Sequence, residues 1–288
     1  MKYAFIQAHH PEFRLSTMLR VFGVSGSGYH AWRARHPHRA RRAVEREAWE
    51  ARVRTTFDAC CSRYGSPRLA HELRAQFGPV SERHVAETMR VLGLRARAAR
   101  RFMATTNSNH ALPVSPNLLN QDFTADAINR KWVGDITYLW TEEGWLYLAT
   151  MIDVYSRAVI GWSMASEMTA DLACSALRMA LAARGNPTGV IVHSDRGSQY
   201  CSHAYQDLIA AAQLRGSMSA KGNCYDNAMA ESFFHSLKVE DIHGRKVSTR
   251  AEMRAIVFEY IEVFYNRTRR HSAIGYISPG QFEAQRLA

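Results

Sequence analysis

The sequence predicts a mixed α/β sheet flanked by helices, preceded by a smaller, all-helical and strongly basic region. Two patterns support this prediction. Before residue 105 the apolar residues recur at helical spacing, and after residue 128 strand and helix patterns alternate as they do in α/β domains. The length of 288 residues is enough for about two domains.

The composition is that of an ordinary globular protein, with 47% apolar and 22% charged residues, which excludes disordered and disulfide-scaffold classes. No run of 18 apolar residues exists, so we expect no membrane partner. The five cysteines are odd in number and sparsely spaced, which fits reduced thiols in the cytoplasm, and Cys224 has no assigned role. The adjacent pairs His9-His10 and Cys60-Cys61 lack the gap between zinc ligands, so we expect no structural zinc.

Positive charge is concentrated in the first part of the chain. Residues 1–120 contain 20 Lys and Arg against 8 Asp and Glu, a net charge of +12, whereas residues 121–288 contain 17 against 18. Of the 37 basic residues 32 are arginine, whose planar donor fork matches phosphate. We therefore expect a nucleic acid partner, with a merely soluble Arg-rich surface as the alternative.

The basic region begins with a helical stretch, residues 1–62, that contains a predicted hairpin over 15–34. Apolar residues follow one helical face up to Phe22, and Gly23 can end that helix. Ser25 can begin a second short helix. Any helical hairpin has this pattern, so it indicates DNA contact only weakly.

A clearer helix-turn-helix pattern occupies residues 63–104. A helix is predicted over 66–77, Gly78-Pro79 breaks it, and Ser81 can cap a second helix. In a helix-turn-helix the second helix lies in the major groove while neighbouring cations neutralise phosphates. The arginines expected to contact DNA around this helix are Arg83, Arg90, Arg95 and Arg97. A helical hairpin that packs on the next domain is the alternative.

Residues 105–128 form a predicted linker, because they are rich in Asn and Pro and show no sustained period. The predicted strands after it cover 132–140, 144–153, 158–165, 189–193 and 215–219. The predicted helices cover 169–184, 203–214, 227–240 and 252–266. A basic turn, Arg267 to His271, follows the last helix.

Three carboxylates stand out by their positions in this order of elements. Asp135 lies in the middle of the first strand, Asp195 follows the buried strand 189–193, and Glu231 lies near the start of a helix. Taken singly, they fit an edge-strand acid, a turn former and a charge that favours the helix dipole. Gathered at strand ends they would repel one another unless cations lay between them, and carboxylates suit Mg²⁺ or Mn²⁺. Two such ions about 3.5–4 Å apart can promote in-line phosphoryl displacement.

Longer segments occur in a defined order around these acids, and 35 residues separate Asp195 from Glu231. The segments are GVSGSGYHAW, RYGSPRLAHELR, WVGDITY, GWLYLA, HSDRGSQY, SMSAKGNCYDNAMAESFFHSLK and YNRTRRHSAIGYISPGQFE. In this pattern the chain resembles the DDE transposases of the insertion sequence three family, specifically their second reading-frame product. Those transposases are similar to retroviral integrases. The resemblance covers nearly the whole chain.

The resemblance implies a ribonuclease-H-like catalytic core over residues 129–240 and a C-terminal helical extension over 241–288. It implies that Asp135, Asp195 and Glu231 are catalytic residues that bind Mg²⁺ or Mn²⁺, with two ions expected. The implied reaction is DNA strand cleavage followed by strand transfer, in which water and then a 3′-hydroxyl attack phosphorus. Nothing in the three acids departs from the family pattern.

The resemblance also implies DNA contacts and partners. Lys238 matches the basic residue that the family carries seven positions after its glutamate, and His235 shares its helical face with Glu231. We expect Lys238, and His235 with it, to contact DNA phosphate, although a solvated lysine is the alternative. The implied partners are insertion-sequence ends, target DNA and the upstream reading-frame product. A dimer or higher oligomer on DNA is expected, because two ends must be held together.

Two other functions are compatible with parts of the sequence. The chain can be a DNA-binding subunit or regulator that is inactive without the upstream product, since it has no long heptad run of its own. A tyrosine recombinase would act without metal through a phosphotyrosine. The residues that fit it are His193, Arg196, Tyr200, Tyr205 and Tyr225.

Overall fold

The structure, a computed structural model, describes residues 1–97, 114–219 and 227–287. It divides into two compact units, Met1–Ala96 and Arg97–Ala288. Part of the predicted linker, residues 105–113, lies outside the described residues, and so do Cys224 and Tyr225. Among the helices that are described, none combines the length and the apolar character needed to cross a bilayer.

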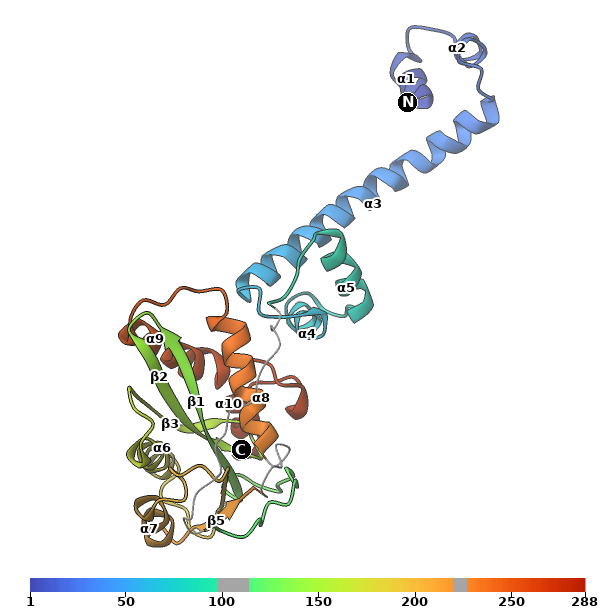
Figure 1. The fold of residues 1–288 in the computed structure, drawn as a ribbon. Coiled ribbons are helices and arrows are strands. Elements are labelled where there is room, and N and C mark those ends of the chain that lie inside the picture. The colour runs from blue at the N-terminus through green and yellow to red at the C-terminus, as the bar shows by residue number, and fades with distance from the viewer. Residues whose placement is uncertain (98–113, 220–226, 288) are drawn as a thin grey trace. The chain divides into compact units, whose positions relative to one another are not determined.

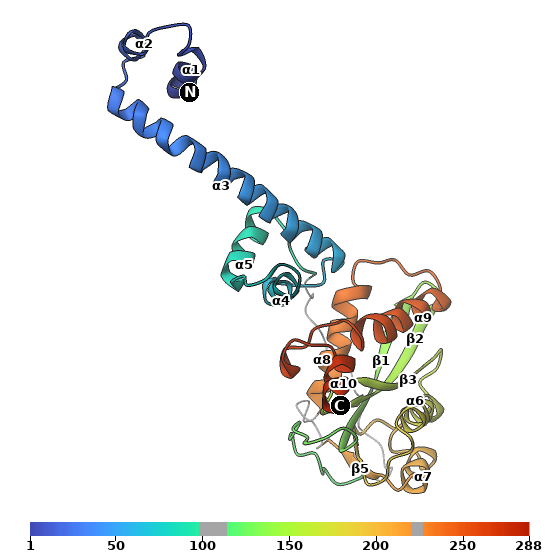
Figure 2. The same ribbon diagram turned by 180° about the vertical axis from the view of Figure 1, so that it is seen from behind.

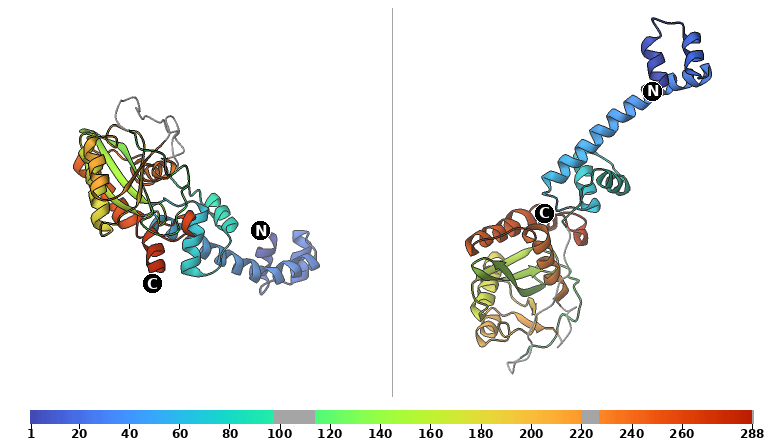
Figure 3. Two further views of the ribbon diagram at one scale, coloured as in Figure 1. Left: turned by 90° about the horizontal axis from the view of Figure 1, so that it is seen from below. Right: turned by 45° about the horizontal axis from the view of Figure 1, so that its top comes forward.

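The first unit is all-helical, as predicted. Its helices are α1 (Lys2–His9), α2 (Leu15–Phe22), α3 (Gly26–Ala59), α4 (Ser66–Phe77) and α5 (Glu82–Val91) (Figure 1). The prediction of a short second helix within residues 15–34 is wrong, because α3 continues for 34 residues and contains Pro37 (Figure 3). Most of its side chains are solvated and form no single apolar stripe, so spacing alone does not reveal its length.

Caps and a small set of buried contacts hold these helices. Ser81 Oγ accepts the His84 N–H at 3.2 Å, which confirms the predicted cap of α5. Trp49 of α3 donates its indole N–H to Thr88 Oγ1 at 2.8 Å and stacks on the His84 ring. These contacts fix α5 against the C-terminal half of α3.

The second unit is built on a five-stranded mixed sheet of order β3-β2-β1-β4-β5. The strands are β1 (Lys131–Thr141), β2 (Gly144–Asp153), β3 (Val159–Ala165), β4 (Ile191–Ser194) and β5 (Arg215–Met218). β1, β2 and β3 pair antiparallel, whereas β4 runs parallel to both β1 and β5. The predicted strand 189–193 is displaced along the chain to 191–194. The predicted mixed α/β class is confirmed.

Alternating side chains give this sheet two buried faces. Val133 and Leu139 of β1 belong to one core, with residues of α8 (Ala228–Leu237) and α9 (Arg250–Phe258). Trp132 and Ile136 pack into the other core, with the helices α6 (Ala170–Ala183) and α7 (His203–Ala211). Figure 2 shows α9 and the last helix, α10 (Pro279–Leu287), in front of the strands.

The close approach of β3 to α6 depends on Gly161. A Cβ atom at this position would lie 2.3 Å from the Ala176 carbonyl oxygen and 2.6 Å from the Ala180 nitrogen. Because both contacts are to helix backbone, any larger side chain would push α6 away from the sheet.

Two helices differ from the predicted continuous ones. The predicted helix 227–240 ends as α8 at Leu237 and continues as a π-helical turn, Lys238–Ile242. The predicted helix 252–266 likewise consists of α9 and a π-helical segment, Glu259–Tyr265. A π turn adds one residue to the repeat, which apolar spacing does not signal. The helices α1 and α10 are additional to those predicted.

The described end of the segment predicted as a linker packs on the sheet. Ser217 Oγ on β5 accepts the N–H groups of Leu118 and Leu119, at 2.9 and 3.2 Å. The Leu119 side chain is buried in the core with α8 and α9. Residues 114–130 therefore belong to the sheet unit.

Candidate active site

Two of the predicted acids come just after the last paired residues of neighbouring parallel strands. Val133 of β1 lies opposite His193 of β4. Asp135 comes two residues after Val133 and is still on β1, and Asp195 comes two residues after His193, one residue past the end of β4. Each carboxylate also accepts a backbone N–H close by in sequence, from Ile136 at 2.8 Å and Gly197 at 2.9 Å.

The third acid, Glu231 on α8, acts on Asp135 through its negative charge. Burial, followed by the negative charge of Asp195, raises the pKa of Asp135 well above its usual range, and Glu231 raises it further. Partial burial also raises the pKa of Glu231. The charges of Asp195 and Glu231 both oppose the ionisation of Asp135, which a divalent cation at this place would relieve.

The side chains of α8 differ in exposure along the helix. Glu231 and His235 are exposed, whereas Lys238 is half-buried at the start of the π turn. Burial lowers the pKa of the Lys238 ammonium, and the charge of Asp135 opposes that shift. Lys238 Nζ also lies 5.0 Å from the centroid of the Tyr138 ring. Lys238 therefore places a positive charge within electrostatic range of Asp135.

The carboxylate oxygens of the three acids suit a hard cation, but the three side chains do not converge on one point. In the part of the chain that the structure describes, no three His, Cys, Asp or Glu side chains lie close enough to hold one metal ion. Asp135 and Asp195 follow the last paired residues of β1 and β4, and the charge of Asp195 raises the pKa of Asp135 more than that of Glu231 does. Carboxylate oxygens are the ligands that Mg²⁺ and Mn²⁺ prefer.

Three of the residues that would serve a tyrosine recombinase, His193, Tyr200 and Tyr205, are buried. His193 is fully buried, with Nδ1 2.8 Å from Ser217 Oγ and Nε2 3.2 Å from Ser219 Oγ. Burial raises the pKa of Tyr200 and of Tyr205, so their hydroxyls resist deprotonation. Neither ring is accessible to a DNA phosphate, which argues against this alternative.

The arginines predicted to contact DNA fall into two groups. Arg83, Arg90 and Arg95 are exposed on or just after α5. Arg97 instead donates to the Glu240 carbonyl at 2.8 Å and lies 4.0 Å from the Asp241 carboxylate. Arg97 therefore contacts the π turn that follows α8.

A buried ion-pair network after α8 is absent from the sequence-based prediction. Arg269, within the predicted basic turn, is only 3% exposed, and its Nε and Nη2 donate to the Glu240 carboxylate at 2.8 and 2.6 Å. The Tyr260 hydroxyl donates to the same carboxylate at 2.8 Å. Arg269 Nη2 also donates to Ser236 Oγ at 3.0 Å. The network connects the C-terminal segment to the helix that carries Glu231.

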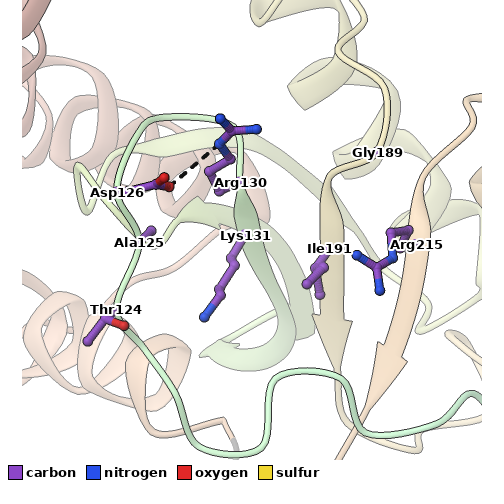
Figure 4. Close-up of a pocket in the computed structure, with 8 residues that line it drawn as sticks. All are labelled: Thr124, Ala125, Asp126, Arg130, Lys131, Gly189, Ile191 and Arg215. Atoms are coloured by element: carbon purple, nitrogen blue, oxygen red, sulfur yellow. Dashed lines mark ion pairs between the residues drawn. The ribbon is translucent and has the colours of Figure 1, made fainter.

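A separate cavity of about 600 Å³ opens at the amino ends of the parallel strands. Figure 4 shows its lining, which is Thr124, Ala125, Asp126, Arg130, Lys131, Gly189, Ile191 and Arg215. Two of its cations are paired, Arg130 with Asp126 at 3.5 Å and Lys131 with Asp122 at 2.8 Å. Asp195 follows the carboxyl end of β4, so this cavity is distinct from the carboxylate cluster.

The mixed sheet, with one acid on β1 and another directly after the parallel strand β4, defines an integrase-type core, and the comparisons with known families agree. Two families described as "Integrase core domain" match residues 125–224 and 231–287. A family described as "HTH-like domain" matches residues 44–102. The predicted combination of a helix-turn-helix region and an integrase core is confirmed.

Among curated proteins, the transposase InsF for insertion sequence IS3A of Escherichia coli strain K12 is 55% identical over 288 residues, which is 100% of both chains. The insertion element IS600 uncharacterized 31 kDa protein of Shigella sonnei is 46% identical over 268 residues, covering 92% of this chain and 97% of that one. The HTLV-2 integrase catalytic core domain in complex with magnesium is a similar solved structure. It shares 17% identity at a TM-score of 0.42 and covers 56% of this chain and 99% of that one.

The chain belongs to the IS3-type insertion sequence transposases, which confirms the resemblance seen in its sequence. Its activity is that of a DDE polynucleotidyl transferase in DNA transposition.

Proposed function

We propose that Asp135, Asp195 and Glu231 are the catalytic carboxylates with which this transposase cleaves DNA at the ends of its insertion sequence and joins them to target DNA. The observation that carries this proposal is the place of the two aspartates just beyond the pairing of β1 with β4, together with the charges of Asp195 and Glu231 that act on Asp135. Asp135 lies on β1, Asp195 directly after β4 and Glu231 on α8, so three separate packed segments hold the acids.

The same carboxylates would hold Mg²⁺ or Mn²⁺, and two ions fit a phosphoryl displacement. When bound, the metal makes the attacking oxygen more nucleophilic and stabilises the leaving oxygen. Lys238 binds a non-bridging phosphate oxygen of the DNA strand beside the carboxylates. His235, exposed one turn after Glu231, contacts the neighbouring phosphate.

The test is strand cleavage and joining of a labelled duplex that carries the element's own end, with Mn²⁺ or Mg²⁺ and with EDTA as control. Glu231→Gln keeps the side chain's size but removes its charge, so we expect activity to fall at least ~1000-fold with DNA binding intact. The matched control is Glu259→Gln, which changes an exposed glutamate of the same unit and should leave activity unchanged. Full activity of Glu231→Gln would overturn the assignment.

The second candidate function, a DNA-binding subunit that needs the upstream reading-frame product, is separated in the same assay. The chain is compared alone and fused to that product. If only the fusion were active, the upstream product would be an obligatory partner. If Glu231→Gln also inactivated the fusion, the carboxylates would still be assigned to the catalytic site.

We infer that Arg83, Arg90 and Arg95 contact DNA phosphates. Each phosphate contact contributes about 0.9 to the slope of log affinity against log salt concentration. Arg83→Gln with Arg90→Gln should therefore weaken binding and reduce that slope by about 2 in a fluorescence anisotropy titration. The control Arg41→Gln changes an exposed arginine of α3 outside the matched helix-turn-helix region. An unchanged slope in the α5 double variant would contradict the contact.

The remaining assignments are part of the same proposal. The proposed domains are the helical regions 1–62 and 63–104, the catalytic core 129–240 and the C-terminal extension 241–288, and the segment 105–128 connects the second to the third with its described end packed on the sheet. The chain acts as a dimer or higher oligomer on DNA, because two ends must be brought together. It works in the cytoplasm, associated with the nucleoid while bound to DNA.

A further inference from the structure

A cluster of aromatic side chains, two of them exposed, lies on the β1–β2 hairpin that also carries Asp135. The register places Tyr138 opposite Tyr147 and Trp140 opposite Trp145, so all four share one face of the hairpin. We call these four residues the aromatic patch. Trp140 is 59% exposed and Trp145 is 42% exposed, which is unusual for the largest apolar side chain.

Three rings of the aromatic patch, those of Tyr138, Trp145 and Trp140, form a continuous chain of contacts. The Tyr138 and Trp145 rings meet edge to face at 5.0 Å, and the Trp145 and Trp140 rings do so at 4.8 Å. Such packing holds each ring in a fixed orientation and leaves faces available for stacking. The tryptophans therefore present a preformed surface.

The aromatic patch is connected to the carboxylate cluster through Lys238. Tyr138 is three residues after Asp135, about 10 Å along the strand, and its side chain leaves the opposite face because side chains alternate. Lys238, whose charge acts on Asp135, also lies over the Tyr138 ring. β4 pairs with β1 only as far as Val133, so among the described residues no strand covers this edge of β1 beyond that point. A DNA strand that leaves the carboxylates across this open edge, past Lys238, would therefore reach the aromatic patch.

The charges around the aromatic patch favour bases rather than phosphates. The turn that closes the hairpin carries Glu142 and Glu143, both exposed, which would repel the sugar-phosphate backbone. Arg250 occupies part of this turn, where its Nε donates to the Trp145 carbonyl at 3.0 Å. Aromatic rings bind any base by stacking, whereas paired bases inside a duplex expose no free face.

We propose that the aromatic patch stacks on unpaired DNA bases next to the cleaved phosphate, either at a frayed duplex end or in a single-stranded extension. The proposal rests on the proposed function, because it needs the carboxylate cluster to be where the DNA strand is cleaved. It adds a contact that distinguishes opened from paired DNA at that place.

The test compares the full chain's affinity for two labelled duplexes with the element's end, one blunt and one with a short single-stranded extension. Stacking on one base changes affinity about 5- to 150-fold, so wild type should prefer the extended duplex by a factor in this range. Trp140→Ala with Trp145→Ala should abolish that preference and leave blunt-duplex affinity unchanged. Trp140→Phe with Trp145→Phe keeps rings at both positions and should retain most of the preference.

Three outcomes would overturn the proposal. Wild type could show no preference for the extended duplex, or the alanine variant could keep the preference. The alanine variant could also lose self-association in sedimentation while keeping the preference, which would make the aromatic patch a contact between copies of the chain. The Glu231→Gln variant distinguishes this proposal from the proposed function. It should keep the preference for the extended duplex while losing DNA cleavage.

Discussion

Asp135→Asn should abolish strand cleavage and joining and, at the same time, raise the melting temperature of the metal-free protein at pH 7. Asparagine keeps an oxygen that can accept the Ile136 N–H, so the local backbone contact survives. It removes the negative charge that burial, Asp195 and Glu231 all oppose. Activity and stability therefore change in opposite directions at this position.

The pH dependence of this effect follows from the direction of the shift. The pKa of Asp135 is raised in the folded state, so its contribution to stability is fully present below the unfolded value of 3.8 and is lost as pH rises through the folded value. Asp135→Asn removes that loss of stability. The resulting gain in melting temperature should be largest at neutral pH and should vanish as pH falls toward 4.

Thermal unfolding in EDTA, followed by circular dichroism between pH 4 and pH 7.5, measures this prediction. Each kcal/mol gained should raise the melting temperature by about 2–4 °C in a domain of this size. Asp171→Asn, at an exposed aspartate of the same unit, is the matched control and should change little. A lower melting temperature for Asp135→Asn at pH 7 would show that the carboxylate is stabilising.

The sheet could be predicted from the sequence because its strands carry strong local signals. β1 and β2 are rich in β-branched and aromatic residues, and a short polar turn separates them. The pattern of the first strand places Asp135 within it, and the short apolar segment 189–193 places Asp195 just after a strand. Their relative position could not be predicted, because it depends on the pairing of β4 with β1 across a long stretch of chain.

The rest of the site could not be predicted, because it depends on packing between distant segments. Arg269 stands in a run of basic residues that predicts a solvated turn, yet it is buried against Glu240. The residue type alone does not show that its partner lies 29 positions earlier. Trp140 and Trp145 belong to strands that were predicted, but only the register shows that they form one exposed face.

The Arg269 network explains how the end of α8 is fixed. Glu240 lies in the π turn that begins at Lys238, and it accepts hydrogen bonds from Arg269 and Tyr260. Ser236, between His235 and Leu237 on α8, accepts another bond from Arg269. The orientation of Lys238 toward Asp135 is thus set by contacts on both sides of it. Disturbing the network should loosen the site as well as the fold.

Arg269→Met should destabilise the sheet unit by about 3–5 kcal/mol, because it leaves the buried Glu240 carboxylate without its cation. Adding Glu240→Gln should restore part of this loss, since a neutral amide is easier to bury than an unpaired charge. The control Arg178→Met removes an arginine from an exposed pair with Asp171, and it should change stability by less than about 1 kcal/mol.

Urea unfolding of the full chain measures these differences, and hydrogen exchange of residues 228–242 assigns them to the α8 region. Exchange there should accelerate strongly in Arg269→Met, less in the double variant and not at all in Arg178→Met. If Arg269→Met behaved like Arg178→Met, Glu240 would have to be satisfied by Tyr260 and solvent alone. The network would then have no part in holding α8 and Lys238 beside Asp135.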